Sequence, residues 1–303
     1  MVPLAPGIAY FDLLFQNTPR VIATVVLDGP EGIAIVDPGP SSTLPALRNG
    51  LDQAGLRLGD VTALVLTHIH LDHAGACGTL LRERPNLKVY VHEKGAPHLV
   101  DPAKLLASAE RLYGEAMENL WGEVQPVPKS AIAALRGGER IEAGGRFLDV
   151  EYTPGHASHH VSYFNRDADV AFVGDTAGVK IVAGGDVLPP TPPPDIDLDS
   201  WRDSLQKIER WRPATLFLTH FGPSGPLGDH LMTLRENIEA ASRLVQDSLA
   251  REGTDEDREA WFTGECQRRL RRRMSGADAA VYEAAGRFDL NWRGLARYWR
   301  KKG

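Results

Sequence analysis

The stretch Thr67-His68-Ile69-His70-Leu71-Asp72-His73-Ala74-Gly75 decides the fold of this 303-residue chain. It directly follows residues 61–66 (Val-Thr-Ala-Leu-Val-Leu), which predict a buried β-strand. Four potential metal ligands therefore stand within a few residues at the exposed end of a strand, where imidazole and carboxylate groups can converge on one or two divalent ions. A lone His-x-His pair is often only part of a polar loop, but four ligands in this setting predict a metal site.

Three more residues of the same chemistry follow far downstream, and they are His156, Asp175 and His220. Asp175 comes after a strand predicted at residues 170–173, and His220 comes after one predicted at residues 215–218. Five of the ten histidines thus belong to one ligand pattern.

At these motifs the chain resembles the metal-dependent hydrolases of the metallo-β-lactamase fold, in the branch of glyoxalase II and the lactonases. The resemblance spans roughly residues 20 to 225, and its motifs stand in the order of that family. They are residues 33–39 (Ile-Ala-Ile-Val-Asp-Pro-Gly), 68–73, 153–156 (Thr-Pro-Gly-His), 173–175 (Val-Gly-Asp) and 218–220 (Leu-Thr-His). Five ordered motifs are specific for the family and far less specific for the substrate.

The resemblance implies a role for each motif residue. The first metal would be held by His68, His70 and His156, the second by Asp72, His73 and His220, and Asp175 would bridge both. Behind the ligands, Asp37 would order the loops under the site. His160 would orient a ligand or carboxylate, although a packed core histidine is an equal alternative.

The resemblance also implies a reaction. Two divalent ions, expected to be zinc with iron or manganese as alternatives, would hold a hydroxide of lowered pKa that attacks an acyl carbon. The second metal or a protonated Asp72, the expected catalytic residue, would serve the leaving group. The substrate class expected is a thioester, ester or lactone.

Two other activities found in the same fold are also compatible with these residues. Nucleases and phosphodiesterases share the His-x-His-x-Asp-His motif, and an iron-dependent oxidoreductase such as a persulfide dioxygenase keeps the first-site ligands. The complete second set (Asp72, His73 and His220) favours a binuclear hydrolase. A flavin-linked diiron protein is disfavoured, because His70 stands where that branch usually has Glu.

Composition limits the partners. The apolar content of 43% suits a sizeable core, and the net charge of −6 argues weakly against a polyanionic partner, so nucleic acid is not expected. No apolar run approaches the roughly 20 residues that cross a membrane. Two cysteines and the lack of a signal-like start predict a cytoplasmic protein. The resemblance implies a small-molecule substrate. A homodimer is left open.

Strand–helix–strand alternation predicts an α/β architecture, and the resemblance specifies a four-layer αββα sandwich. We expect a catalytic domain at residues 1–226, with a helical insertion at about 101–136, and a C-terminal helical extension at 227–303 built from three long helices. The insertion and the rigid loop at residues 188–195 (Leu-Pro-Pro-Thr-Pro-Pro-Pro-Asp) are expected to form the substrate pocket without touching the metals. Tyr113 and Trp121 suggest a partly apolar acyl group. The basic run Arg268–Arg273 is expected to be a solvated helix face.

Overall fold

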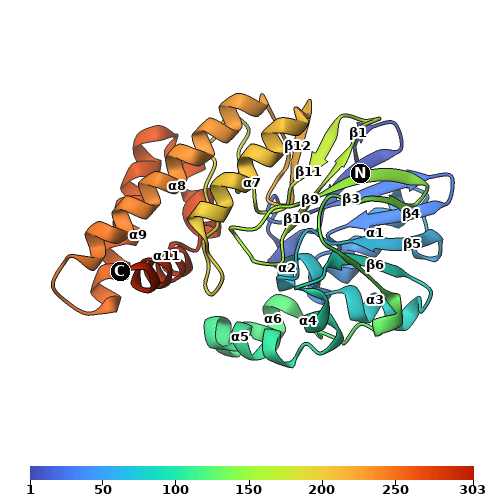
Figure 1. The fold of residues 1–303 in the computed structure, drawn as a ribbon, viewed down its shortest axis with the longest axis horizontal. Helices are drawn as coiled ribbons and strands as arrows, with labels where there is room; N and C mark the ends of the chain where they lie inside the picture. The colour runs from blue at the N-terminus through green and yellow to red at the C-terminus, as the bar shows by residue number, and fades with distance from the viewer.

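A computed structural model describes the backbone of residues 1–303 and every side chain except that of Ala284. Two β-sheets lie face to face with helices on both outer sides, and further helices extend the molecule at its C-terminal end (Figure 1). The predicted αββα sandwich is therefore confirmed.

The first sheet has seven strands in sequence order. They are β1 (Val2–Ala5), β2 (Ile8–Asp12), β3 (Ala23–Gly29), β4 (Gly32–Val36), β5 (Val61–Val65), β6 (Lys88–His92) and β7 (Ile132–Leu135). The pairs from β1 to β4 are antiparallel, and those from β4 to β7 are parallel.

The second sheet has six strands in the order β13-β12-β11-β10-β9-β8. They are β8 (Arg140–Ala143), β9 (Arg146–Tyr152), β10 (Val161–Asn165), β11 (Val170–Phe172), β12 (Thr215–Leu218) and β13 (Gly222–Ser224). Only β11 and β12 are parallel neighbours within this sheet.

The strands read as continuous apolar runs because both faces of each sheet are covered. On β4, Ala34 and Val36 face the second sheet, whereas Ile33 and Ile35 pack under the outer helices. Those helices are α1 (Leu44–Gln53) and α3 (Cys77–Glu83) on the first sheet, and α7 (Leu198–Trp211) and α8 (Leu227–Leu249) on the second. The candidate site can therefore lie only where the strands end and their loops begin.

The helical insertion differs from its prediction at both ends. It begins with α4 (Ala96–Val100), and its last residues form β7, which extends the first sheet. Within it, the helical pattern of residues 103–121 forms two helices, α5 (Ala103–Tyr113) and α6 (Met117–Trp121), because Gly114 between them has a φ of +51° that interrupts the helix.

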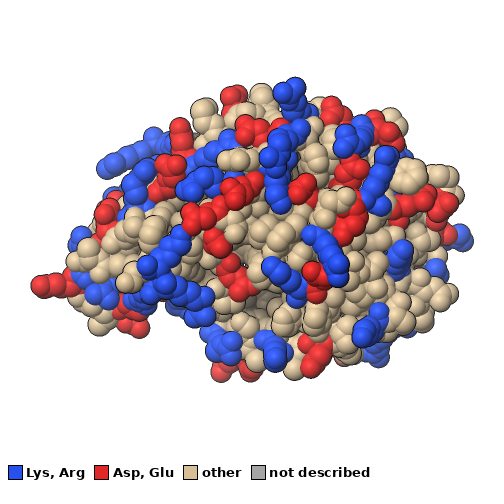
Figure 2. Space-filling view, in the orientation of Figure 1, with Lys and Arg blue, Asp and Glu red and all other residues tan. Residues whose placement is uncertain are grey.

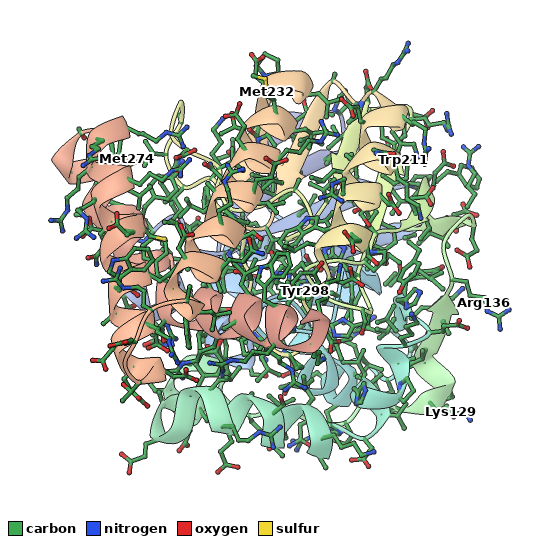
Figure 3. The ribbon with its side chains drawn as sticks, turned by 60° about the vertical axis from the view of Figure 1, so that its left-hand side comes forward. Lys129, Arg136, Trp211, Met232, Met274 and Tyr298 are labelled. Carbon is green, nitrogen blue, oxygen red and sulfur yellow. The ribbon has the colours of Figure 1, made fainter. Side chains whose placement is uncertain are left out.

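The C-terminal part is helical as predicted, but it has four helices in place of three. They are α8, α9 (Asp255–Arg273), α10 (Gly276–Ala285) and α11 (Phe288–Lys302). The break between α10 and α11 falls at Gly286 and Arg287, and Arg287 has a φ of +37°. These helices share one apolar core with the second sheet, and in Figure 3 α11, marked by Tyr298, lies across the front above α5.

Acidic and basic side chains alternate over the face shown in Figure 2. Within the basic run of α9, three arginines form ion pairs: Arg268 with Glu265, Arg271 with Glu283 and Arg273 with Asp186. Among the described helices, none combines the length and the apolar character needed to cross a bilayer.

Candidate metal centre

The seven predicted ligands meet at one end of the sandwich. His68 and His70 lie in the loop after β5, and Asp72 and His73 lie in the short helix α2 (Leu71–Ala74) that follows. His156, Asp175 and His220 lie in the loops after β9, β11 and β12. Each ligand therefore follows the carboxyl end of a strand, as the motif pattern predicted.

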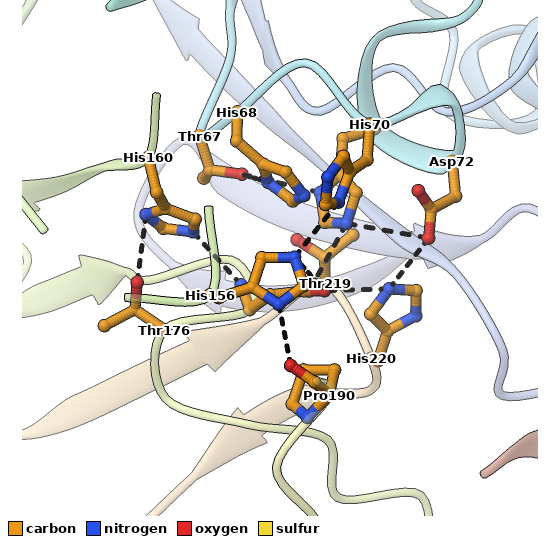
Figure 4. Close-up of polar contacts among 12 residues, drawn as sticks. Thr67, His68, His70, Asp72, His156, His160, Thr176, Pro190, Thr219 and His220 are labelled. Atoms are coloured by element: carbon orange, nitrogen blue, oxygen red, sulfur yellow. Dashed lines mark hydrogen bonds and ion pairs between the residues drawn. The ribbon is translucent and has the colours of Figure 1, made fainter. Parts of the chain in front are cut away.

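Three groups of candidate ligand atoms each fit within 4.8 Å: His68–His70–His156, His68–His73–Asp175 and Asp72–His73–His220. Asp175 stands between the two predicted triads. Its Oδ2 lies 3.4 Å from His156 Nε2, and its Oδ1 lies 3.3 Å from His73 Nε2 and 3.5 Å from His220 Nε2. One carboxylate oxygen thus faces each triad. Figure 4 labels His70 and His156 of one triad and Asp72 and His220 of the other.

Several buried atoms of the centre are suited to a cation. His68 Nε2, His73 Nε2 and Asp175 Oδ1 have no hydrogen-bond partner among the described residues, although each is buried. His70 Nδ1 and His156 Nε2 lie 3.0 Å apart, so two ring nitrogens face each other. Since orphaned buried polar atoms are costly, this donor set fits divalent metal ions bound by imidazole and carboxylate.

Hydrogen bonds determine which ring nitrogen faces the centre in three of the histidines. The Nδ1–H of His73 donates to Asp37 Oδ2 at 2.8 Å, that of His156 to the Pro190 carbonyl at 2.8 Å, and that of His220 to the Val21 carbonyl at 2.6 Å. In each of these three residues Nε2 therefore faces the metal centre, and in the neutral ring it carries the lone pair, an arrangement typical of histidine ligands.

Asp37 joins three loops of the centre. Its Oδ1 accepts from the Thr67 backbone N–H at 2.8 Å, and its Oδ2 accepts from the hydroxyls of Thr67 at 2.7 Å and Thr219 at 2.9 Å. Because Thr67 precedes His68 and Thr219 precedes His220, Asp37 holds both ligand loops and His73 together.

His160 lies behind Asp175. Its Nε2 accepts from the Asp175 backbone N–H at 3.2 Å, and its Nδ1 lies 3.0 Å from the hydroxyls of Thr153 and Thr176. Gly174 has a φ of +45°, and a Cβ there would lie 2.7 Å from His160 Nε2. Only glycine therefore allows this close approach of the backbone to the ring.

The imidazoles of the first triad favour the neutral form. Burial lowers the pKa of His70 to about 4. Burial, reinforced by neighbouring imidazoles, also holds the pKa of His68 well below its ordinary value, and burial lowers the pKa of His156. Neutral imidazole is the form that binds metal.

The second triad is rich in negative charge. Burial acts to lower the pKa of His73, but the carboxylates of Asp175, Asp37 and Asp72 outweigh it and raise that pKa well above its ordinary value. Burial acts to raise the pKa of Asp175, but nearby histidines, His220 first, hold it well below its ordinary value. The pKa of Asp72 is likewise lowered against its burial by His73 and His220. Both aspartates are therefore carboxylates at neutral pH, suited to bind cations.

Aromatic and apolar side chains cluster around Leu71, the residue before Asp72. Trp121 stacks on Phe15 with ring centroids 5.5 Å apart and meets Tyr113 edge-on at 5.0 Å, next to Leu71. Burial, followed by the charge of Asp72, raises the pKa of Tyr113. From the C-terminal extension, Arg287 lies 5.4 Å from the Tyr113 ring.

Three further histidines lie outside these ligand groups. His159 is buried with its ring 5.5 Å from that of His70. His92 stacks on Tyr152 at 4.3 Å, and His98 lies in α4 near Leu71. None of these three belongs to a ligand group among the described side chains.

Two further side chains lie close to the ligand motifs in the sequence. Cys77 is fully buried in the core, and burial raises the pKa of its thiol, as suits a small apolar residue. Lys180 Nζ lies 3.3 Å from Ser224 Oγ, and its backbone N–H donates to the His220 carbonyl at 2.7 Å.

Sequence reasoning missed the backbone contacts of the centre. The Pro190 and Val21 carbonyls leave no signal in their residue types, and Thr67 and Thr219 are recognisable only as neighbours of ligands. The loop at residues 188–195 was expected to stay clear of the metals, but Pro190 contacts His156. The loop therefore contacts a candidate metal ligand, in addition to its expected place in the wall of the substrate pocket.

A protein-family model described as "Metallo-beta-lactamase superfamily" matches residues 17–220. The "Metallo-beta-lactamase fold-containing protein ST1585" of Sulfurisphaera tokodaii is 29% identical over 228 residues, which cover 73% of this chain and 82% of that protein. A hydroxyacylglutathione hydrolase of Synechococcus is 30% identical over 152 residues, or 50% of this chain and 45% of that enzyme.

Solved structures extend the likeness to the C-terminal helices. The metallo-beta-lactamase family protein TTHA1429 of Thermus thermophilus has a TM-score of 0.72 at 23% identity and covers 99% of this chain and 95% of its own. The structure of ST1585 has a TM-score of 0.65 at 25% identity and covers 95% of this chain and 98% of its own.

Proposed function

This chain belongs to the metallo-beta-lactamase superfamily of metallo-hydrolases, and we propose that it is a binuclear enzyme that hydrolyses an ester, thioester or lactone. The observation that carries the proposal is the position of Asp175, with one carboxylate oxygen toward each histidine-containing triad. A shared carboxylate offsets the charge of two cations held close together. In a mononuclear site held by the first triad, Asp72, His73 and His220 would have no metal to bind.

Zinc is the metal we propose, since imidazole nitrogens and carboxylate oxygens suit it, and iron or manganese would use the same donors. Two bound ions would supply a water of lowered pKa and would polarise the carbonyl group under attack. Residues of the chain would then transfer the proton and bind the acyl group.

Asp72 is the residue we assign to the proton. Its Oδ2 faces His220 Nε2 at 3.4 Å and His73 Nε2 at 3.8 Å. Its side chain is 26% exposed, so a substrate can reach the carboxylate. As a carboxylate, Asp72 first accepts the proton of the attacking water and then gives it to the alkoxide or thiolate that leaves, so that water adds across the acyl bond.

The surroundings of Asp72 favour an acyl substrate over a phosphodiester. Phe15 and Tyr113 offer partly exposed aromatic surface, and the buried Trp121 packs against both. The nearby Arg287 is already paired with Asp289 through two contacts of 2.8 and 3.0 Å. A phosphodiester site would be expected to offer unpaired cationic groups. The similarity to a hydroxyacylglutathione hydrolase, a thioesterase by its name, supports the same class.

The test is hydrolysis by metal-loaded protein of a panel that contains thioesters, esters, lactones, phosphodiesters and a persulfide. We expect turnover of at least one acyl substrate and its loss on chelation. Turnover of phosphodiesters alone, or oxygen consumption with the persulfide, would overturn the proposal.

A further inference from the structure

The Pro190 carbonyl sets the orientation of a candidate ligand. It accepts the Nδ1–H of His156 at 2.8 Å, so that Nε2 points toward His70 Nδ1 and Asp175 Oδ2 (Figure 4). The position of His156 therefore depends on whatever holds Pro190 in place.

The proline-rich loop has few means of anchoring its own backbone. Among residues 189–194 (Pro-Pro-Thr-Pro-Pro-Pro), only Thr191 has a backbone N–H. That N–H donates to Asn291 Oδ1 at 2.7 Å, and the Thr191 hydroxyl donates to the Asn291 carbonyl at 3.2 Å. The single amide donor of this segment is thus bound by the C-terminal helix α11.

Both partners of this anchor are buried, with Thr191 at 1% and Asn291 at 9% exposure. Asn291 is itself fixed, because its Nδ2 donates to the Gly286 carbonyl at 3.0 Å. One turn later on α11, a Cβ at Gly294 would lie 2.0 Å from the Thr191 carbonyl oxygen. Glycine within a helix is destabilising relative to alanine, and here it lets the loop pass directly against the helix.

We infer that Asn291 is a positioning residue for His156, and that α11 thereby completes the first metal site through Thr191 and Pro190. The inference rests on the proposed role of His156 as a metal ligand. It gives the C-terminal extension a part in metal binding although none of its described residues belongs to a ligand group.

The test compares two substitutions of one side chain. Asn291→Leu removes the acceptor for the Thr191 N–H, whereas Asn291→Asp keeps that acceptor, replaces the donor to Gly286 and adds a carboxylate charge. The control Trp292→Phe breaks a different buried bond of α11, from Trp292 Nε1 to Ser248 Oγ at 2.8 Å, and leaves Thr191 untouched.

The readout is chelator competition for Co²⁺, followed by visible absorption, with thermal unfolding recorded in parallel. We expect Asn291→Leu to bind one of its two ions about 10- to 100-fold more weakly, as for other losses of a group that orients a ligand. Asn291→Asp should stay within a few fold of wild type, and Trp292→Phe should lose thermal stability without losing metal affinity.

Equal affinity in Asn291→Leu and wild type would overturn the inference, and so would an equal loss in Trp292→Phe. Should Asn291→Leu not fold, Gly294→Ala provides a second variant, because it must displace the Thr191 backbone and should weaken the same ion. A wild-type chain that binds fewer than two ions would instead contradict the proposed function, so the two failures can be told apart.

Discussion

The loops of the sandwich and the helices around them contribute to the centre in different ways. The loops after β5, β9, β11 and β12, together with α2, supply all seven candidate ligands. Within the described residues, the insertion and the C-terminal helices supply none, but they place Tyr113, Trp121 and Arg287 near Asp72 and anchor the Pro190 loop. From this difference we predict that metal chemistry and substrate choice depend on separate parts of the chain, joined at a few contacts.

The largest effect is expected at Asp175, the residue shared by both triads. Asp175→Ala removes the bridging charge, so both ions should bind more weakly and activity should fall by orders of magnitude. Metal content and turnover measure this. The matched control is Asp149→Ala, another aspartate of the second sheet, which pairs with Arg166 away from the centre. A variant at Asp175 that kept two tightly bound ions and near-normal turnover would remove the basis of the proposal.

A smaller loss is expected at His160, which supports Asp175 from behind. Substitution by alanine removes the acceptor for the Asp175 N–H and should cost about 10- to 100-fold in metal affinity or activity. His92→Ala is the control, since His92 is also buried but stacks on Tyr152 outside the ligand groups. Equal losses in the two variants would indicate that His160 is only a core residue.

The superfamily and the sandwich, both confirmed, could be predicted because their signal is local. His68, His70, Asp72 and His73 follow one apolar strand, and the remaining candidate ligands end short motifs in a fixed order. The structure brings these side chains together, and their role as metal ligands stays a prediction. Long-range contacts have no such signal. Asn291 and Thr191 stand 100 residues apart, and neither residue type predicts the other.

The edge strand β7 and the helix breaks could not be predicted from the sequence pattern either. The four-residue strand β7 falls within the predicted insertion because so short a run carries little alternation, and its pairing with β6 decides its structure. The breaks at Gly114 and Arg287 lie inside long helical patterns and depend on single residues with positive φ.

Changes confined to the insertion should alter selectivity and spare the metals. Tyr113→Leu and Trp121→Leu remove aromatic surface near Asp72 but no ligand, so relative activity across esters, thioesters and lactones should shift while metal content stays constant. Val281, an exposed apolar residue of α10, provides a control site as Val281→Ala. An unchanged activity profile would place the acyl pocket elsewhere.

The junction between α8 and the sandwich should be sensitive to acid. His230 is buried, bound to Ser224 Oγ and the Ala177 carbonyl at 2.8 Å each, and burial lowers its pKa to about 4. The unfolded chain, with a His pKa of about 6.5, takes up this proton first as pH falls. The contribution of His230 to stability is therefore complete above that pKa and is lost as pH falls toward 4, by an amount on the order of 3 kcal/mol.

Urea unfolding at pH 7 and pH 4.5 checks this, with His230→Gln as the comparison, because glutamine does not titrate. The wild type should lose more stability than the variant between the two pH values. Equal losses would exclude His230 as the acid-sensitive group.

The metal content of the wild-type chain tests the central claim most directly. Elemental analysis of protein purified under metal-replete conditions should approach two equivalents of zinc, iron or manganese per chain, because Asp175 faces two separate triads. A firm value of one equivalent would contradict the binuclear centre on which the account depends.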